Sequence, residues 1–292
     1  MESFTIKDLE NLSGIKAHTI RIWEQRYQFI KPCRTCTNIR TYSIDELKKI
    51  LNIALLNKYG YKISYIDKMG EEAIKETILS LTQAEALHER IINELIENTV
   101  DLDLEVLETI ITRCISKRGV EDAFIQIIFP FLERVAMLWR ANNINPAQQQ
   151  LVTNIIRRKL IVGIENVSST KKVDKSVLLF LPENEHRELG LLFVNYLLKK
   201  HGITTIYLGA NISFDDMEYV VNCKKPTYLY SHLTCFYTGF CFDKFIKNIS
   251  QRFAGKSFII SGVITQSYKK KLPAHISLKK SFTEVAAFVA EL

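Results

Sequence analysis

Short apolar runs alternate with amphipathic stretches beyond residue 172, and this alternation is the strongest constraint on the fold. Parallel strands need a crossover connection, so buried strands that alternate with helices form a parallel sheet with helices on its faces. We therefore predict a doubly wound α/β domain over residues 171–292, with a ligand crevice at the carboxyl ends of its strands. The predicted strands are Val177–Leu181, Thr205–Leu208, Thr227–Tyr230 and Phe258–Ile260.

The middle of the chain has a purely helical pattern. We predict that residues 76–170 form a small four-helix bundle. A capping box of Thr82 and Glu85 is expected to begin it, Gly119 to separate its second and third helices, and Pro130 to kink the third. The predicted helices lie near 83–98, 103–118, 121–141 and 146–166.

The first 75 residues predict a winged helix-turn-helix domain. A helix is expected from about Ala17 to Tyr27, and Pro32 then stops the helix and begins a short basic loop suited to a wing. Ser43 and Glu46 predict a capping box for the next helix. The helix from Ala17 to Tyr27 has a polar face that can enter a major groove, formed by Ala17, His18, Arg21 and Gln25. Ile20 and Trp23 lie on its opposite face and are expected to point into the core.

The positive charge of the chain is concentrated in this first domain. Residues 1–70 contain 12 Lys and Arg against 7 Asp and Glu, so they hold most of the net charge of +7. A basic helical module of this kind favours a polyanionic partner such as DNA.

Composition excludes several other classes. No apolar run reaches the roughly 18 residues that a membrane span needs, and the first residues do not resemble a signal peptide, so we expect a cytoplasmic protein without a membrane partner. The six cysteines are scattered, which indicates reduced thiols. The Cys33-x-x-Cys36 spacing has no second Cys/His pair to complete a metal site, so we predict no metal ligands. We interpret the spacing as a coincidence, with a pair of thiols that senses oxidants as the alternative.

One run of residues resembles a known family. Thr19–Tyr27, Lys31-Pro32, Arg34-Thr35, Asn38–Arg40 and Tyr42 are similar to the signature of MerR-family transcription regulators. The resemblance implies binding to promoter DNA, with RNA polymerase and further copies of the chain as partners. Trp23 and Glu24 are interpreted as core packing and pairing within the domain. The predicted DNA-binding residues are Lys16, Ala17, His18, Thr19, Arg21, Gln25, Tyr27, Arg34, Asn38, Arg40 and Tyr42.

The bundle and the α/β domain together resemble the effector half of the cobalamin-dependent MerR-type repressors, which include light-sensing regulators of carotenoid genes. In that family an acid, any residue and a cobalt-ligating histidine follow the first strand, and a glycine comes three residues later. Alignment on Gly190 puts Glu185 at the acid and Arg187 at the histidine, while His186 lies one position early. Arginine offers no lone pair to a metal, so Arg187 cannot replace the ligand.

Other elements of the family's site are partly kept. Ser231-His232-Leu233 matches a Ser-x-Leu element, and Ser261-Gly262 matches half of a Gly-Gly element. Trp139 corresponds to a tryptophan that covers the upper face of cobalamin in the family, with plain bundle core as the alternative interpretation. Gln149 and Gln150 stand where the family has a Glu-His pair.

These replacements predict a regulator whose sensor or assembly domain has lost cobalamin ligation and has no cofactor. Two alternatives remain: a cobalamin-binding photoreceptor-type repressor, and a cobalamin-dependent enzyme. The enzyme alternative is disfavoured because the chain has no stretch left for a catalytic domain, so we predict that the protein is not an enzyme.

Overall fold

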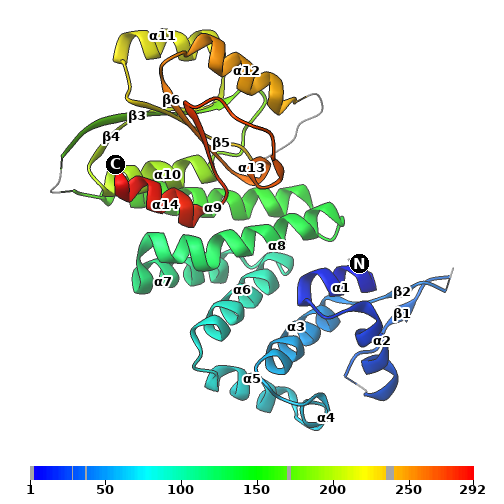
Figure 1. The fold of residues 1–292 in the computed structure, drawn as a ribbon. Coiled ribbons are helices and arrows are strands. Elements are labelled where there is room, and N and C mark those ends of the chain that lie inside the picture. Colours follow the sequence, from blue (N-terminus) through cyan, green and yellow to red (C-terminus); the bar gives the residue numbers. More distant parts are fainter. Residues whose placement is uncertain (1–2, 28, 37, 170–171, 235–239) are drawn as a thin grey trace. The chain divides into compact units, whose positions relative to one another are not determined.

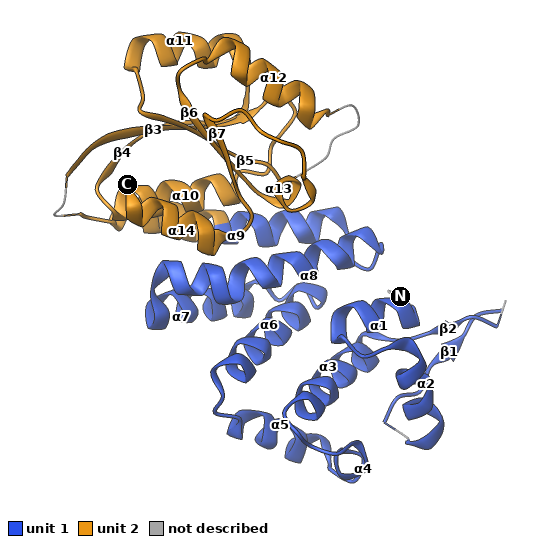
Figure 2. Cartoon of the chain, in the orientation of Figure 1, with its two compact units in different colours: residues 1–156 blue, residues 157–292 orange. Residues whose placement is uncertain are grey.

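The computed structural model describes residues 3–27, 29–36, 38–169, 172–234 and 240–292. The chain divides into two compact units, residues 1–156 and 157–292 (Figure 2). The predicted domain boundary after residue 75 falls inside the helix α5 (Glu71–Ser80), and the predicted boundary after residue 170 lies outside the described residues.

The first unit begins with short helices and a two-stranded wing. Its elements are α1 (Ile6–Ser13), α2 (Ala17–Arg26), β1 (Cys33–Arg34), β2 (Arg40–Thr41), α3 (Ile44–Lys58) and α4 (Ile63–Ile66). Gly14 ends α1 in the left-handed conformation, with φ of 74°, and the antiparallel strands β1 and β2 form the wing. Phe4 pairs with Tyr42, which joins the N-terminus to the end of the wing.

The capping box predicted before α3 forms only in half. Ser43 caps the helix by accepting the N–H of Glu46, but the Glu46 carboxylate accepts the backbone N–H of Lys31 at 3.0 Å instead of reaching back to Ser43. The carboxylate therefore ties the chain that follows α2 to the start of α3.

The helical pattern in the middle of the chain is confirmed. The elements after α5 are α6 (Ala84–Val100), α7 (Leu104–Ala123), the π-helical turn η1 (Phe124–Ile128), α8 (Phe129–Arg140) and α9 (Pro146–Asn166). Gly119 interrupts α7 with φ of 80°. Pro130 was expected to kink a helix; a π-helical turn ends two residues before it, and proline has no N–H to continue the ladder of i to i−4 hydrogen bonds.

The predicted capping box at Thr82 and Glu85 is wrong. The N-cap of α6 is Gln83, and its side chain makes no capping hydrogen bond. The pattern of residue types was present, but the helix begins one residue further along the chain than that pattern requires.

The second unit contains the predicted parallel sheet. Five parallel strands lie in the order β4-β3-β5-β6-β7. Helices α11 and α12 cover one face and α10 and α14 the other (Figure 1). The elements are β3 (Val173–Pro182), α10 (Leu189–Lys200), β4 (Ile203–Ile212), α11 (Phe214–Lys224), β5 (Tyr228–His232), α12 (Phe242–Arg252), β6 (Ser257–Ser261), α13 (Val263–Ser267), β7 (Ile276–Lys279) and α14 (Phe282–Glu291).

The order of the strands indicates where ligands bind in folds of this type. The chain leaves β3 toward β4 at one side and then returns to pair β5 at the other, so the connections diverge at the carboxyl end of β3. Ligands of doubly wound folds bind at such a switch point. The loop from residue 183 to residue 188 and the ends of β5 and β6 are therefore the segments to inspect.

We predict that Gly119→Ala destabilises the protein, because only glycine adopts φ of 80° with ψ of 165° without strain. A Cβ at Gly119 would meet nothing within 4 Å, so the cost is backbone strain alone, about 1–3 kcal/mol. Gly70→Ala is the matched control, since this site is equally open but has φ of −71°. Urea unfolding measures both variants, and equal midpoints would contradict the prediction.

Candidate functional site

The second helix, α2, presents a polar face beside the wing. Ile20 and Trp23 are 0% and 6% exposed and pack into the core, as predicted. On the other face His18, Arg21 and Gln25 are exposed. Among the described residues Arg21 has neither an ion pair nor a hydrogen bond, so its guanidinium can meet a ligand without first breaking a contact.

The remaining predicted residues of this segment are less free. Ala17, Thr19 and Tyr27 are half-buried, and the Tyr27 ring stacks on Phe29 with centroids 5.7 Å apart. Lys16 is exposed and pairs with Glu10. These side chains frame the polar face of α2.

The Glu24 carboxylate connects α2 to the wing. Arg40 Nε donates to both carboxylate oxygens, at 3.0 and 3.2 Å, and the Tyr42 hydroxyl donates to Oε2 at 3.3 Å. Burial, reinforced by the negative charge of Glu24, raises the pKa of Tyr42 to about 12. The interpretation of Glu24 as an intradomain partner agrees with this geometry.

Two residues at the wing need a corrected description. Tyr42 is only 1% exposed, so its ring belongs to the core and does not face DNA directly. Arg40 has a half-buried side chain held by Glu24. At the exposed tip, Arg34 Nη1 donates to Asn38 Oδ1 at 2.7 Å, and Asn38 has φ of 62°, which closes the turn.

In the second unit, the loop after β3 is built around a buried carboxylate. Glu185 is 2% exposed, and its Oε1 accepts the backbone N–H of Arg187 at 3.0 Å. The Glu185 carbonyl accepts the N–H of Asn211 at 3.2 Å, and Asn211 Oδ1 accepts the N–H of Asn184. The end of β4 thus holds this loop, while the side chains of His186 and Arg187 are exposed.

A buried polar network lies at the carboxyl ends of β5 and β6. Ser261 Oγ lies 2.6 Å from both the Tyr230 hydroxyl and His232 Nδ1. The His232 ring stacks on Phe282 with centroids 5.0 Å apart. Burial lowers the pKa of His232 to about 4, so its ring is neutral at neutral pH, and burial raises the pKa of Tyr230.

The chain itself fills the space beside two glycines of this region. A Cβ on Gly190 would lie 2.2 Å from His232 Cδ2, and a Cβ on Gly262 would lie 2.1 Å from the Leu233 carbonyl oxygen. Gly262 also has φ of 105°, which favours glycine. Both glycines are therefore required by contacts within the protein, whether or not a ligand binds.

Cobalamin fits these residues poorly. Arg187 stands where the family has its histidine, and a guanidinium has no lone pair for cobalt. The imidazole of His232 is buried against Gly190 and Ser261 and is not presented to the surface. One feature fits a ligand better: Ser231 Oγ is buried and has no hydrogen-bond partner in the part of the chain that the structure describes.

The predicted cap residues are located in the first unit. Trp139 lies in the last turn of α8 and is half-buried. In α9, Gln149 is half-buried and Gln150 is exposed, whereas the neighbouring Gln148 is buried and donates to the carbonyls of Thr99 and Val100.

Sequence reasoning missed the part played by His232. The residue was noted only as the middle position of Ser231-His232-Leu233, although a histidine between two residues of a buried strand end is itself a signal for a satisfied polar network. Phe282, its stacking partner, follows β7, which the strand pattern did not predict.

Two family models match successive parts of the chain. Residues 4–72 match the model of the MerR HTH family regulatory proteins, and residues 71–162 match the model of the B12 binding domain. With the exposed face of α2 and its wing, these matches define a DNA-binding transcriptional regulator that combines a MerR-type helix-turn-helix with a B12-binding-type domain.

Two curated relatives are transcriptional repressors of Myxococcus xanthus. The chain is 24% identical to the HTH-type transcriptional repressor CarH over 78% of its own length and 77% of the relative. It is 27% identical to the HTH-type transcriptional repressor CarA over 70% of its own length and 68% of the relative. These relatives confirm the predicted resemblance and agree with a regulator that is not an enzyme.

A solved structure confirms the fold class. The monomethylamine corrinoid protein of Methanosarcina barkeri matches with a TM-score of 0.57 at 14% identity, over 70% of this chain and 99% of that protein. At this identity the likeness concerns the fold alone.

None of the described helices has the length and apolarity that a bilayer crossing requires. In the same residues no group of three His, Cys, Asp or Glu side chains is arranged to hold a metal ion, and Cys33 and Cys36 are exposed free thiols.

We predict that His232 makes stability depend on pH. Its folded-state pKa of about 4 lies below the ordinary 6.5, so between these values the unfolded chain binds a proton that the folded chain does not. Stability is therefore lost as pH falls below about 6.5, by roughly 1.4 kcal/mol per pH unit, and the loss levels off near pH 4.

Urea unfolding of the wild type and His232→Gln at pH 7.5, 6.0 and 5.0 tests this dependence. The variant should show the shallower decline, because only the wild type must protonate a buried ring. Both proteins have an uncharged residue 232 at pH 7.5, which supplies the reference for each series. Parallel declines would contradict the prediction.

Proposed function

We propose that this regulator binds promoter DNA as a homo-oligomer through α2 and the wing, and that its C-terminal domain mediates assembly or sensing without ligating cobalt. Residues 1–75 serve as the DNA-binding domain, 76–170 as the helical bundle and 171–292 as the Rossmann-like domain. The observation that carries the proposal is the exposed polar face of α2 beside a wing that Glu24 holds in place.

The geometry supports two kinds of DNA contact. The exposed side chains of His18, Arg21 and Gln25 suit base edges in a major groove, and Arg34 at the wing suits backbone phosphates. One small module makes few contacts, and two-fold symmetry doubles them on an inverted repeat. RNA polymerase is the further partner that a MerR-type promoter complex implies.

Loss of cobalt ligation is supported by several independent positions. Arg187 replaces the ligand, Gln149 and Gln150 replace an acid and an imidazole, and His232 fills the space beside Gly190. The network of Ser261 with Tyr230 and His232 satisfies the buried polar groups there without a cofactor. A fold can remain after the chemistry of its site has gone.

We predict that Arg21→Ala and Arg40→Ala together weaken DNA binding and flatten its salt dependence. Each arginine that also neutralises a phosphate contributes about −0.9 to the slope of log K against log salt, so its loss reduces the magnitude of the slope by that amount. Binding of the full-length protein is measured by fluorescence anisotropy on a duplex selected from genomic fragments, at several salt concentrations. The single variants distinguish the effect of Arg21 from that of Arg40. Only Arg40 also holds the wing through its ion pair with Glu24.

The double variant Lys247→Ala and Lys269→Ala is the charge-matched control, because both lysines are exposed in the second unit. Tyr42→Phe removes a hydrogen bond to Glu24 and no charge, so it should leave the salt slope unchanged and tests separately how the hold on the wing affects affinity. Unchanged affinity and slope in the Arg21/Arg40 variant would remove these residues from the interface.

We predict that the wild type does not retain adenosylcobalamin. The triple variant Arg187→His, Gln149→Glu and Gln150→His should recover some binding, because Trp139, Ser231 and Gly262 remain. The visible spectrum of each protein after incubation and desalting measures retained corrinoid. Arg187→Gln is the control that removes the charge without supplying an imidazole.

Retention of stoichiometric cobalamin by the wild type would overturn the proposed loss. It would favour a cobalamin-binding photoreceptor-type repressor instead, for which the unpartnered Ser231 Oγ is the supporting observation. Sedimentation of the same cofactor-free samples tests assembly: a protein that is monomeric at micromolar concentration and oligomeric only with corrinoid would contradict assembly without cofactor.

A further inference from the structure

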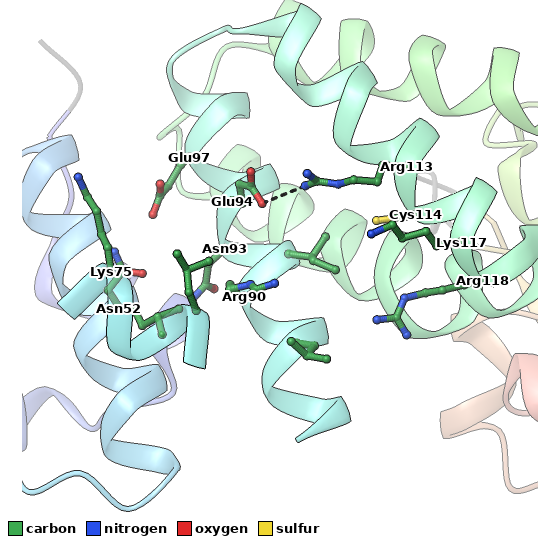
Figure 3. A pocket seen from close by; sticks show the side chains of 14 residues that line it. Asn52, Lys75, Arg90, Asn93, Glu94, Glu97, Arg113, Cys114, Lys117 and Arg118 are labelled. Atoms are coloured by element: carbon green, nitrogen blue, oxygen red, sulfur yellow. Dashed lines mark ion pairs between the residues drawn. The ribbon is translucent and has the colours of Figure 1, made fainter. Parts of the chain in front are cut away.

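A basic cleft of about 620 Å³ lies in the first unit (Figure 3). Its walls come from four helices: Asn52 on α3, Lys75 on α5, residues 87–97 on α6 and residues 113–118 on α7. Its volume is within the range of small-molecule sites. Neither the DNA-binding face nor the crevice of the α/β domain uses these side chains.

Positive charge exceeds negative charge along the walls. Five cationic side chains face two carboxylates: Lys75, Arg90, Arg113, Lys117 and Arg118 against Glu94 and Glu97. Glu94 pairs with Arg113 at 3.7 Å. Burial raises the pKa of Glu97.

In the described part of the chain, three of these cations have no carboxylate partner. Within the described residues Arg90 and Lys117 have neither an ion pair nor a hydrogen bond. Arg118 Nη1 lies 2.8 Å from His88 Nε2, and burial together with the positive charge of Arg118 lowers the pKa of His88, so this imidazole is neutral and accepts the hydrogen bond. Arg118 therefore keeps its full charge beside the cleft.

Apolar side chains form the rest of the lining. Ile78 is buried, Leu87 and Ile91 are half-buried, and Leu79 is 65% exposed. An apolar side chain left this exposed beside a hollow gains free energy when a ligand covers it, at about 25 cal/mol per Å². Cations and apolar surface occur in the same cleft, so a ligand that uses both must be amphiphilic.

We propose that this cleft binds a small amphiphilic anion, with its carboxylate, sulfonate or phosphate head on Arg90, Lys117 and Arg118 and its apolar body on Leu79, Leu87 and Ile91. In Figure 3, Arg113, Lys117 and Arg118 project from α7 across the hollow toward α6, and Arg90 lies between the helices. A neutral apolar molecule would cover the cations without neutralising them. Inorganic phosphate would leave the apolar lining in water.

Isothermal titration calorimetry of the full-length protein with decanoate, decanol and inorganic phosphate tests the proposal. Decanoate, used below the concentration at which it forms micelles, should bind to one site per chain. Decanol lacks the charge and phosphate lacks the apolar body, so each should bind at least tenfold more weakly. Absence of decanoate binding, or equal binding of either comparison compound, overturns the proposal.

Variants locate the site. Arg90→Gln with Lys117→Gln should weaken decanoate binding at least tenfold, whereas Lys247→Gln with Lys269→Gln, which removes the same charge from the second unit, should leave it unchanged. Leu79→Glu alters an exposed side chain, so it should fold normally and repel the same ligand. Circular dichroism checks the fold of each variant. Decanoate affinity that survives in the Arg90/Lys117 variant overturns the assignment to this cleft.

Discussion

The proposed DNA-binding face depends on one partly buried carboxylate, that of Glu24. It accepts hydrogen bonds from Arg40 and Tyr42, so it fixes the wing against the helix whose other face carries Arg21. Hydrogen bonds to a charged group contribute about 1.5–3 kcal/mol each when the geometry is good. A wing and a helix can read one stretch of DNA only if their spacing is fixed, and Glu24 supplies that constraint from inside the domain.

The α/β domain satisfies the hydrogen bonds of its buried polar groups in a different way. Its network at Ser261 is neutral, because burial keeps His232 uncharged and keeps the proton on Tyr230. Glycines at 190 and 262 let the chain pack against that network at distances that a Cβ would forbid. The region that would receive a ligand in the resembling family is thus packed largely with the protein's own side chains, and this packing is consistent with a domain that folds without one.

The sequence was most informative where burial imposes a pattern on contiguous residues. Val177–Leu181 and Phe258–Ile260 are strands because nearly every residue is covered, and an unbroken apolar run is visible in any reading of the chain. β7 was not predicted because only Ile276 is buried in its four residues. A strand that short owes its conformation to pairing with β6, which no local pattern records.

The same distinction applies to the candidate site: residues set by local helical spacing could be predicted, and residues set by contacts between distant elements could not. Arg21 could be placed on the polar face from helical spacing alone, since Ile20 and Trp23 fix the opposite face. Tyr42 could not be recognised as core, because its burial depends on the pairing with Phe4 and on Glu24 from a separate helix. For the same reason the packing of His232 on Gly190 and Phe282, which bears most directly on cobalamin, required the assembled sheet.

The basic cleft lies where a ligand could influence DNA binding. Asn52 on its wall belongs to α3, the helix that follows the wing, whereas Arg90 and Lys117 belong to the bundle. A ligand shifts an equilibrium only by the difference between its affinities for the two states. An anion that draws α6 and α7 toward α3 would therefore change DNA affinity only if DNA binding changes the spacing of these helices. By linkage DNA would then change the anion's affinity by the same factor. Because side chains of α3 and of the bundle line the same cleft, such coupling needs no signal from the α/β domain.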